Sequence, residues 1–166
     1  MTRSIGRALT DALVERFSQR DVRGRLGVGL PFVTVDAESQ PHPMLLSYLE
    51  VKAYDTRTVG IVIVARSGSA RNLAERGRAT LMAIEADATV YVKLRTVDGP
   101  LPVEGGEEFG LGYFLMEVDE VLEDAAAEWE AAMRITSPIR YAPPPSLDEP
   151  WARATLAALA VPRARA

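Results

Sequence analysis

The chain has 166 residues, of which 48% are hydrophobic and 25% charged, and its formal net charge is -4. These values are typical of one soluble globular domain with a hydrophobic core, which we expect to cover residues 1–166. The negative charge and the absence of a basic run give no reason to expect nucleic-acid binding. The absence of cysteine excludes disulfides, thiol catalysis and iron–sulfur clusters, and a single histidine leaves too few ligands for an ordinary zinc site.

The chain carries no sign of a membrane or export segment. No apolar run approaches the roughly 20 residues that span a bilayer. The N-terminus lacks the apolar core of a signal peptide. We therefore expect a cytoplasmic protein that does not bind membranes.

The first 20 residues have helical periodicity. Ile5, Leu9, Leu13 and Phe17 recur every four residues, and Ser4 can cap the helix that they predict over residues 1–20. The opposite face mixes acidic and basic residues. This mixture favours packing on the protein's own sheet over lying on a membrane surface.

The middle of the chain, residues 28–123, is rich in strand patterns. Short turns join the first three patterns, which predicts an antiparallel meander. The segment 79–86 could be helix or strand, and its tight flanking turns favour a strand. Asp98-Gly99-Pro100 predicts the end of the fifth strand. The six predicted strands cover residues 28–37, 44–53, 59–65, 79–86, 89–97 and 109–122.

This pattern predicts a mainly β protein with flanking helices, in which a six-stranded antiparallel sheet closes into a small barrel. Residues 124–166 follow as a helix over 124–134, a proline-rich arm over 135–145 and a final helix from 148 or 149 to about 160. Trp129 and Trp151, on the two helices, could stack on a flat ring, but packing in a core or an interface is the favoured interpretation.

The strongest functional signal is the strand, turn and helix at residues 58–78. An apolar strand ends at Ala65, and a helix is predicted over residues 70–76 with Gly77 after it. Two serines and two arginines, Arg66, Ser67, Ser69 and Arg71, lie about the start of this helix. Unpaired N–H groups and the helix dipole favour a bound anion such as phosphate there. The alternative is a capped turn whose arginines point into water.

Other polar residues give weaker signals. His42 could be a general acid or base, although a turn residue is the commoner role. Lys93 and Arg95 could contact an acidic substrate or a partner, or simply be solvated. The sequence shows no supportable nucleophile–base arrangement, so the catalytic residues are unknown at this point. If the protein is an enzyme, a cofactor would supply the chemistry.

Three segments resemble the pyridoxamine 5'-phosphate oxidase-like family, the FMN-binding split barrels. They are Gln40-Pro41-His42-Pro43 before a strand, the segment SGSARNL from Ser67 to Leu73, and FLMEVDEV in the last strand. The resemblance covers residues 28–124. It implies that the barrel is split and that the protein is a homodimer with two FMN sites at the subunit interface.

The resemblance also implies a set of cofactor-binding residues. Arg66, Ser67, Ser69, Arg71 and Asn72 would hold the FMN phosphate. The backbone at Leu46, Ser47 and Tyr48 would run along the ring system. Family members often have a lysine where this chain has Ser69, so the two arginines are the remaining cations.

The implied activity is that of a flavin-dependent oxidoreductase acting on a small molecule. Two alternatives stay open: a non-catalytic carrier or sensor that binds flavin or haem, and a deazaflavin-dependent reductase.

Overall fold

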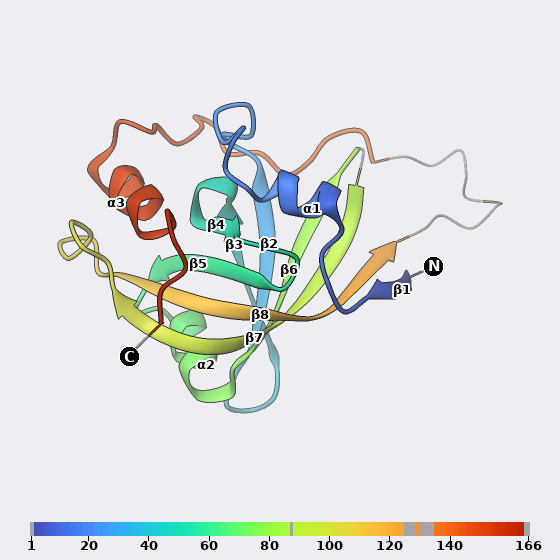
Figure 1. The fold of residues 1–166 in the computed structure, drawn as a ribbon, viewed down its shortest axis with the longest axis horizontal. Helices are drawn as coiled ribbons and strands as arrows, with labels where there is room; N and C mark the ends of the chain where they lie inside the picture. Colours follow the sequence, from blue (N-terminus) through green and yellow to red (C-terminus); the bar gives the residue numbers. More distant parts are fainter. Residues whose placement is uncertain (1, 87, 125–128, 130–134, 165–166) are drawn as a thin grey trace.

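The computed structural model describes residues 2–86, 88–124, 129 and 135–164, which fold around one antiparallel sheet (Figure 1). The sheet has eight strands: β1 (Thr2–Gly6), β2 (Gly29–Val35), β3 (Pro41–Ser47), β4 (Val51–Ala53), β5 (Thr58–Val64), β6 (Arg78–Glu85), β7 (Ala88–Pro102) and β8 (Leu111–Asp124). The helical elements are α1 (Asp11–Arg16), the 3-10 turn η1 (Tyr48–Glu50), α2 (Gly68–Arg76) and α3 (Pro150–Ala158).

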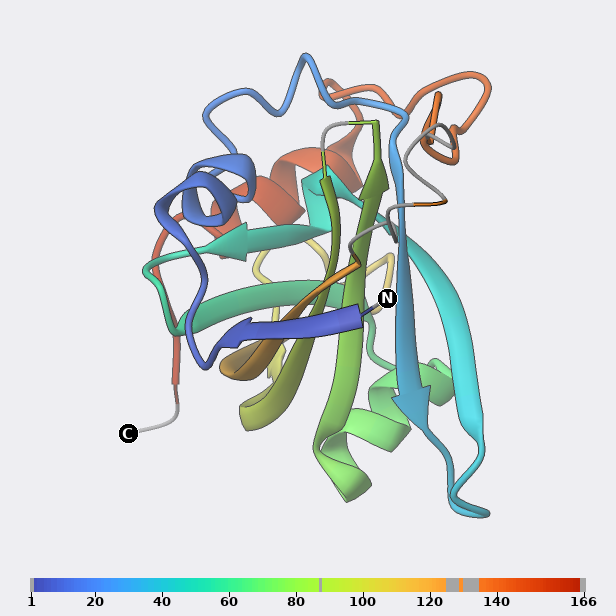
Figure 2. The same cartoon turned by 90° about the vertical axis from the view of Figure 1, so that its right-hand side faces the viewer.

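The strand order explains why the barrel is split. Neighbouring strands run β3-β2-β6-β7-β8-β5-β4, and β1 pairs with the far end of β8. The two ends of this path, β3 and β4, follow each other in the chain and are joined only by η1. The sheet therefore curls on itself (Figure 2), and within the described residues no strand pairing joins β3 to β4. The predicted mainly β split barrel is confirmed, with eight strands in place of six.

The predicted helix over residues 1–20 is wrong in its first half. Thr2–Gly6 is strand β1, which pairs with β8 through pairs such as Ser4 with Leu122. The helix α1 begins only at Asp11, where the Thr10 hydroxyl accepts a hydrogen bond from the Leu13 amide at 3.3 Å. The apolar residues at positions 9, 13 and 17 are buried nonetheless, so the apolar spacing identified the core contacts and not the secondary structure.

The predicted meander is also wrong, because the second predicted strand is two strands. Ser47 ends β3 and forms a capping box with Glu50, which turns the chain into η1 before β4 begins. As a result β2 pairs with β3 on one side and with β6 on the other. The fifth predicted strand does not stop at Asp98: β7 continues past a register shift, and Leu101 pairs with Tyr113 of β8.

One core fills the barrel and a second lies beneath α3. Alternate residues of β7, Val90, Val92 and Leu94, point into the barrel and are at most 5% exposed, as the alternation predicts. On the outer side of the sheet, Leu159 at the end of α3 packs with Val62 of β5. The final predicted helix is thereby confirmed as α3. None of the helices in the described ranges is long and apolar enough to cross a membrane.

The chain after β8 follows the prediction where it is described. Most of the helix predicted over residues 124–134 lies outside the described residues. Trp129 is described, and at 80% exposed it does not pack in a core. The proline-rich arm is irregular and runs beside the start of β2. There the Gly29 amide donates to the Ile139 carbonyl at 2.8 Å, and the Tyr141 amide donates to the Gly27 carbonyl at 2.7 Å.

The free edge at β3 carries two prolines. Pro41 pairs with Val35 and Pro43 pairs with Val33. Proline has no backbone N–H to donate, and within sheets it is confined to positions such as this.

A buried ion cluster holds the N-terminal segment against the barrel. Glu85, at the end of β6, accepts hydrogen bonds from Arg16 at 2.6 Å, from Arg25 at 3.2 Å and from the Tyr48 hydroxyl. The side chains of Arg16 and Glu85 are 9% and 11% exposed. The guanidinium of Arg25 also lies over the Tyr48 ring, 5.0 Å from its centroid. One carboxylate thus joins α1, η1, β6 and the segment between α1 and β2.

We expect Glu85→Gln to destabilise the protein by about 3 kcal/mol, because removal of one charge from a buried pair leaves the other without compensation. Urea unfolding of the variant and the wild type measures this difference. The matched control is Glu15→Gln, which breaks the exposed pair between Arg20 and Glu15, whose side chains are 77% and 59% exposed. This control should lose less than about 1 kcal/mol. Equal losses in the two variants would contradict the role of the cluster.

Candidate functional site

The start of α2 has the local structure that the sequence predicts. Ser67 is the N-cap, and its hydroxyl accepts a hydrogen bond from the Ala70 amide at 3.1 Å. Gly77 ends the helix in the left-handed conformation. Within the described residues, the amides of Gly68 and Ser69 donate to no protein acceptor. Two backbone donors are therefore left for a ligand at the positive end of the helix.

Two arginines flank these amides in the sequence. Arg66 lies in the turn between β5 and α2, and Arg71 lies in the first turn of α2. Both side chains are exposed. Neither makes a hydrogen bond or an ion pair with any residue in the described part of the chain. Unpaired arginines beside free amides can bind a phosphate with charge-assisted hydrogen bonds.

The structure adds His42 to this site. A Cβ built on Gly68 would lie 3.1 Å from Nε2 of His42, so the imidazole of β3 lies over the first residue of α2. The glycine is what permits this close approach. The sequence alone did not connect the two residues, although a glycine between two capping serines is the signal that could have suggested a close neighbour.

A buried relay of hydrogen bonds fixes this arrangement. The Asn72 amide group donates to the Thr34 hydroxyl at 3.0 Å, and that hydroxyl donates to the His42 carbonyl at 3.3 Å. Thr34 is fully buried and Asn72 is 6% exposed. Asn72 therefore holds α2 against β2 and β3, and it also lines the hollow beside α2. Ser69 is likewise buried, at 2% exposed.

A hollow of about 330 Å³ lies between α2 and the turn that joins β2 to β3. Its charges are mixed, because Arg71 shares it with the carboxylates Asp36, Glu38 and Glu75. The Asp36 carboxylate is engaged within the turn, where it accepts from the amides of residues 38 and 40. Across the described residues, no group of three or more histidine or carboxylate side chains is placed to hold a metal ion.

The segment whose backbone the resemblance places along a flavin ring has its side chains in the interior. Leu46 is fully buried, and Ser47 and Tyr48 are 4% and 3% exposed. The Ser47 hydroxyl donates to Glu50 at 2.9 Å, and the Tyr48 hydroxyl belongs to the Glu85 cluster, where burial and the Glu85 hydrogen bond raise the pKa of Tyr48. The side chains of this segment are therefore not exposed to a ligand, and the backbone contact that the resemblance implies stays a prediction.

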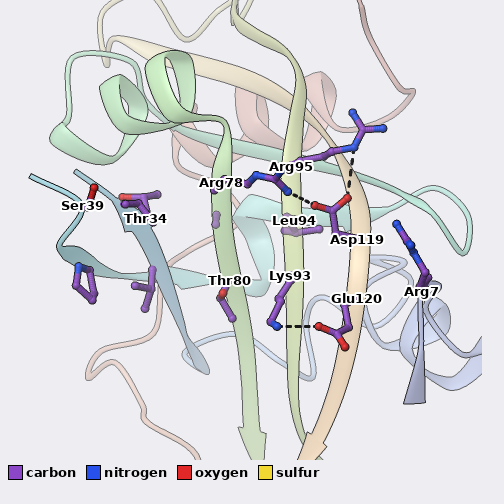
Figure 3. Close-up of a pocket in the computed structure, with 14 residues that line it drawn as sticks. Arg7, Thr34, Ser39, Arg78, Thr80, Lys93, Leu94, Arg95, Asp119 and Glu120 are labelled. Carbon is purple, nitrogen blue, oxygen red and sulfur yellow. Dashed lines mark hydrogen bonds and ion pairs between the residues drawn. The ribbon is translucent and has the colours of Figure 1, made fainter. Parts of the chain in front are cut away.

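A second and larger hollow, of about 740 Å³, lies on the outward face of β2, β6, β7 and β8 (Figure 3). We call it the sheet groove. Cationic side chains outnumber carboxylates in its lining. Its charged residues are Arg7, Arg78, Lys93, Arg95, Asp119 and Glu120.

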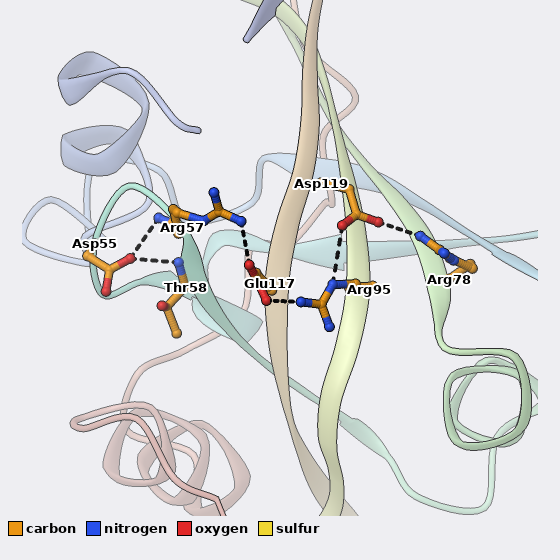
Figure 4. Close-up of polar contacts among 7 residues, drawn as sticks. All are labelled: Asp55, Arg57, Thr58, Arg78, Arg95, Glu117 and Asp119. Atoms are coloured by element: carbon orange, nitrogen blue, oxygen red, sulfur yellow. Dashed lines mark hydrogen bonds and ion pairs between the residues drawn. The ribbon is translucent and has the colours of Figure 1, made fainter. Parts of the chain in front are cut away.

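A row of ion pairs crosses the strands beside the sheet groove (Figure 4). Glu117 of β8 is bound by both Arg57 and Arg95, and Asp119 is bound by Arg78 and by Arg95 at 3.3 Å. The hydrogen bond from Arg57 is the main cause that lowers the pKa of Glu117. Lys93 and Arg95, predicted as solvated or as contacts for an acidic ligand, are thus paired on the protein surface while still lining the groove.

No known family model matches the chain, and no curated protein matches it in sequence. Two solved structures are similar to it in fold. One is an FMN-binding protein from Syntrophomonas wolfei subsp. wolfei, with a TM-score of 0.53 and 11% identity over 71% of this chain and 90% of that one. The other is a proposed pyridoxamine 5'-phosphate oxidase from Lactobacillus delbrueckii, with a TM-score of 0.54 and 12% identity over 72% of this chain and 98% of that one. The chain therefore has the split-barrel fold of pyridoxamine 5'-phosphate oxidase-like proteins.

We expect Glu50→Gln to change how stability depends on pH. Burial raises the pKa of Glu50 above its ordinary value of 4.5, against the lowering effect of its hydrogen bonds from Ser47. A raised pKa in the folded state means that the contribution of Glu50 is fully present below the unfolded pKa and is lost as pH rises through the folded pKa. Glutamine keeps an oxygen for the Ser47 amide and has no charge to bury. As the pH rises above 4.5, the wild type should therefore lose stability relative to the variant.

Urea unfolding at several pH values measures this difference. The free energies of unfolding of the two proteins should diverge with rising pH. Parallel profiles would show that Glu50 is not destabilised by its burial.

Proposed function

We propose that the protein binds FMN and acts as a flavin-dependent oxidoreductase on a small molecule. The observation that carries this proposal is the start of α2, where two exposed arginines lie beside two amides in the sequence, and none of these groups has a partner among the described residues. The fold supports it, because an FMN-binding protein has the same architecture. FMN, once bound, would supply the transfer of hydride or electrons, which the side chains of the chain are not arranged to perform.

In this proposal the phosphate of FMN lies at the start of α2. Arg66 and Arg71 would contact its oxygens, and the amides of Gly68 and Ser69 would donate to it. Ser67 contributes by capping the helix and so presenting these amides. Asn72 contributes by holding α2 against Thr34. The two arginines take over the charge that a lysine at position 69 would bring.

The proposal includes a homodimer. The outward face of the β2 and β3 hairpin supports it, because this face is apolar and partly exposed: Leu45 is 42% exposed, opposite Pro31, and Val33 lies opposite Pro43. A second copy of the chain could cover this row, since apolar patches of this kind are typical of protein interfaces.

Size-exclusion chromatography with light scattering should give twice 18.1 kDa, and Leu45→Lys should shift the protein towards the monomer. A monomeric wild type would contradict the dimer.

The double variant Arg66→Ala/Arg71→Ala should weaken FMN binding by about 3 kcal/mol or more, because each hydrogen bond to a charged group contributes about 1.5–3 kcal/mol. Fluorescence titration with FMN measures the loss. Riboflavin, which lacks the phosphate, should bind both proteins equally. Arg20→Ala, which removes an exposed arginine elsewhere, is the matched control. Equal FMN titration curves for the double variant and the wild type would rule out this placement.

A turnover assay distinguishes an oxidoreductase from a non-catalytic carrier. The FMN-loaded protein should be reduced by a nicotinamide donor and reoxidised by an acceptor over many cycles. Tight FMN binding without turnover would favour the non-catalytic alternative.

A further inference from the structure

The hollow beside α2 lies on the opposite face of the β2 and β3 hairpin from the apolar row of the proposed dimer. Successive side chains of a strand point to opposite faces. His42, which lines the hollow, therefore points away from the face that carries Pro43 and Leu45. Figure 2 shows α2 beside the turn of this hairpin. A second copy of the chain on the apolar row thus does not occupy this hollow.

One buried side chain of the hollow has an unused hydrogen-bond acceptor. Asn72 is 6% exposed and lines the hollow. Its side-chain nitrogen donates to the Thr34 hydroxyl, whereas its oxygen Oδ1 accepts no hydrogen bond from any described residue. Among these residues, no fully enclosed polar side-chain atom lacks a partner. The Asn72 oxygen is therefore not enclosed, and it opens into the hollow that its side chain lines.

The bond to Thr34 fixes the direction of this oxygen. The nitrogen and the oxygen of an amide are attached to one carbon, so a side chain whose nitrogen is held by β2 has its oxygen held as well. Thr34 is fully buried, which leaves it little freedom to move. A largely buried acceptor without a partner is unfavourable. It is a fixed position at which a ligand with an N–H donor gains a hydrogen bond.

The charged lining of the hollow is mainly acidic. Asp36 accepts from the amides of residues 38 and 40 through Oδ1 alone, so its second oxygen is available. Glu38 makes no ion pair with a described residue. The carboxylate of Glu75 has a loose ion pair with Arg76, at 3.8 Å. Against these three carboxylates the lining has one arginine, Arg71. The hollow therefore attracts a cation.

The spacing of these groups suits an organic cation and not a metal ion. Across the described part of the chain, no three histidine or carboxylate side chains are placed to share one metal ion. An ammonium group has three N–H donors, which can reach acceptors that lie apart from one another. The volume of about 330 Å³ is at the lower end of the range of sites for small organic molecules.

We propose that the hollow beside α2 binds a small primary amine. Its ammonium group donates to Oδ1 of Asn72, and the carboxylates of Asp36, Glu38 and Glu75 supply the complementary charge. This site does not rest on the proposed binding of FMN. Arg71 lies at the border of the two sites: its charge opposes a cation in the hollow, and a phosphate bound to it would reduce that opposition.

The test is a titration of the ¹⁵N-labelled full chain with n-butylamine, at neutral pH, constant ionic strength and without FMN. The side-chain NH₂ signals of Asn72 report on its oxygen, because both belong to one amide. These signals and the backbone amides of residues 36–38 should shift in a saturable manner. Tetramethylammonium, which has no N–H donor, and 1-butanol, which has no charge, should each bind at least about threefold more weakly.

Variants assign the charge to named residues. Glu38→Gln and Glu75→Gln change exposed side chains, so both variants should fold, and each should weaken butylamine binding at least about twofold. Glu15→Gln, which changes an exposed carboxylate elsewhere, is the matched control and should leave the affinity unchanged. Arg71→Gln should strengthen butylamine binding at least about twofold, because it removes the opposing charge.

The same variant separates this site from the proposed flavin site, since Arg71→Gln should weaken FMN binding. A wild type that binds butylamine in the hollow but does not bind FMN would contradict the proposed function and support the amine site.

Four results would overturn the amine site. Shifts that omit the Asn72 side chain would show that amines bind surface carboxylates in general. Equal binding of tetramethylammonium would remove the role of the N–H donors. The same shifts at a lower concentration of Mg²⁺ would make the hollow a metal site. An equal loss of affinity in Glu15→Gln and Glu38→Gln would remove the role of the local charge.

Discussion

The relay from Asn72 through Thr34 to the backbone of His42 is the interaction on which both candidate sites depend. Asn72 donates to the Thr34 hydroxyl at 3.0 Å, and Thr34 in turn donates to the His42 carbonyl. Since Thr34 is fully buried, an unpaired hydroxyl there would cost about 1–3 kcal/mol. The relay therefore fixes α2 against the hairpin of β2 and β3. That hairpin places His42 over Gly68 and the carboxylates of its turn in the hollow beside α2.

The strand β8 divides the molecule into an apolar inside and a charged outside. Phe114, Met116 and Val118 are fully buried in the barrel, while Glu117 and Asp119 between and after them form ion pairs across the outward face. Exposed pairs of this kind contribute little stability singly. Their effect is to hold long cationic side chains in fixed places on the outward face of the sheet.

The parts of the fold that could be predicted from sequence are those where local pattern and tertiary packing agree. The alternation in β7 and the capped start of α2 are of this kind. The segment around Ser4 was misassigned because its apolar spacing suits a helix, whereas β8 offers it a strand partner. The break after Ser47 has a local signal, the capping box with Glu50, which the apolar run around it obscured.

Only those residues of the candidate site that are close together in the sequence could be predicted. Ser67, Arg66 and Arg71 are close in sequence, and one strand-to-helix turn brings them together. His42 reaches the same place from β3 through tertiary structure, and the partners of Asn72 and Tyr48 come from distant strands. Sequence spacing carries no information about such partners. For Ser47 and Tyr48 the family resemblance suggested the segment but not the inward direction of the side chains.

The two prolines on β3 have a consequence for how the protein behaves at high concentration. A split barrel leaves a strand edge that could recruit an edge from another molecule and grow into an aggregate. At Pro41 and Pro43 that edge has no N–H group to offer. An incoming strand would lose ladder bonds at two alternate positions, so the gap in the barrel can stay open without acting as a template for fibre growth.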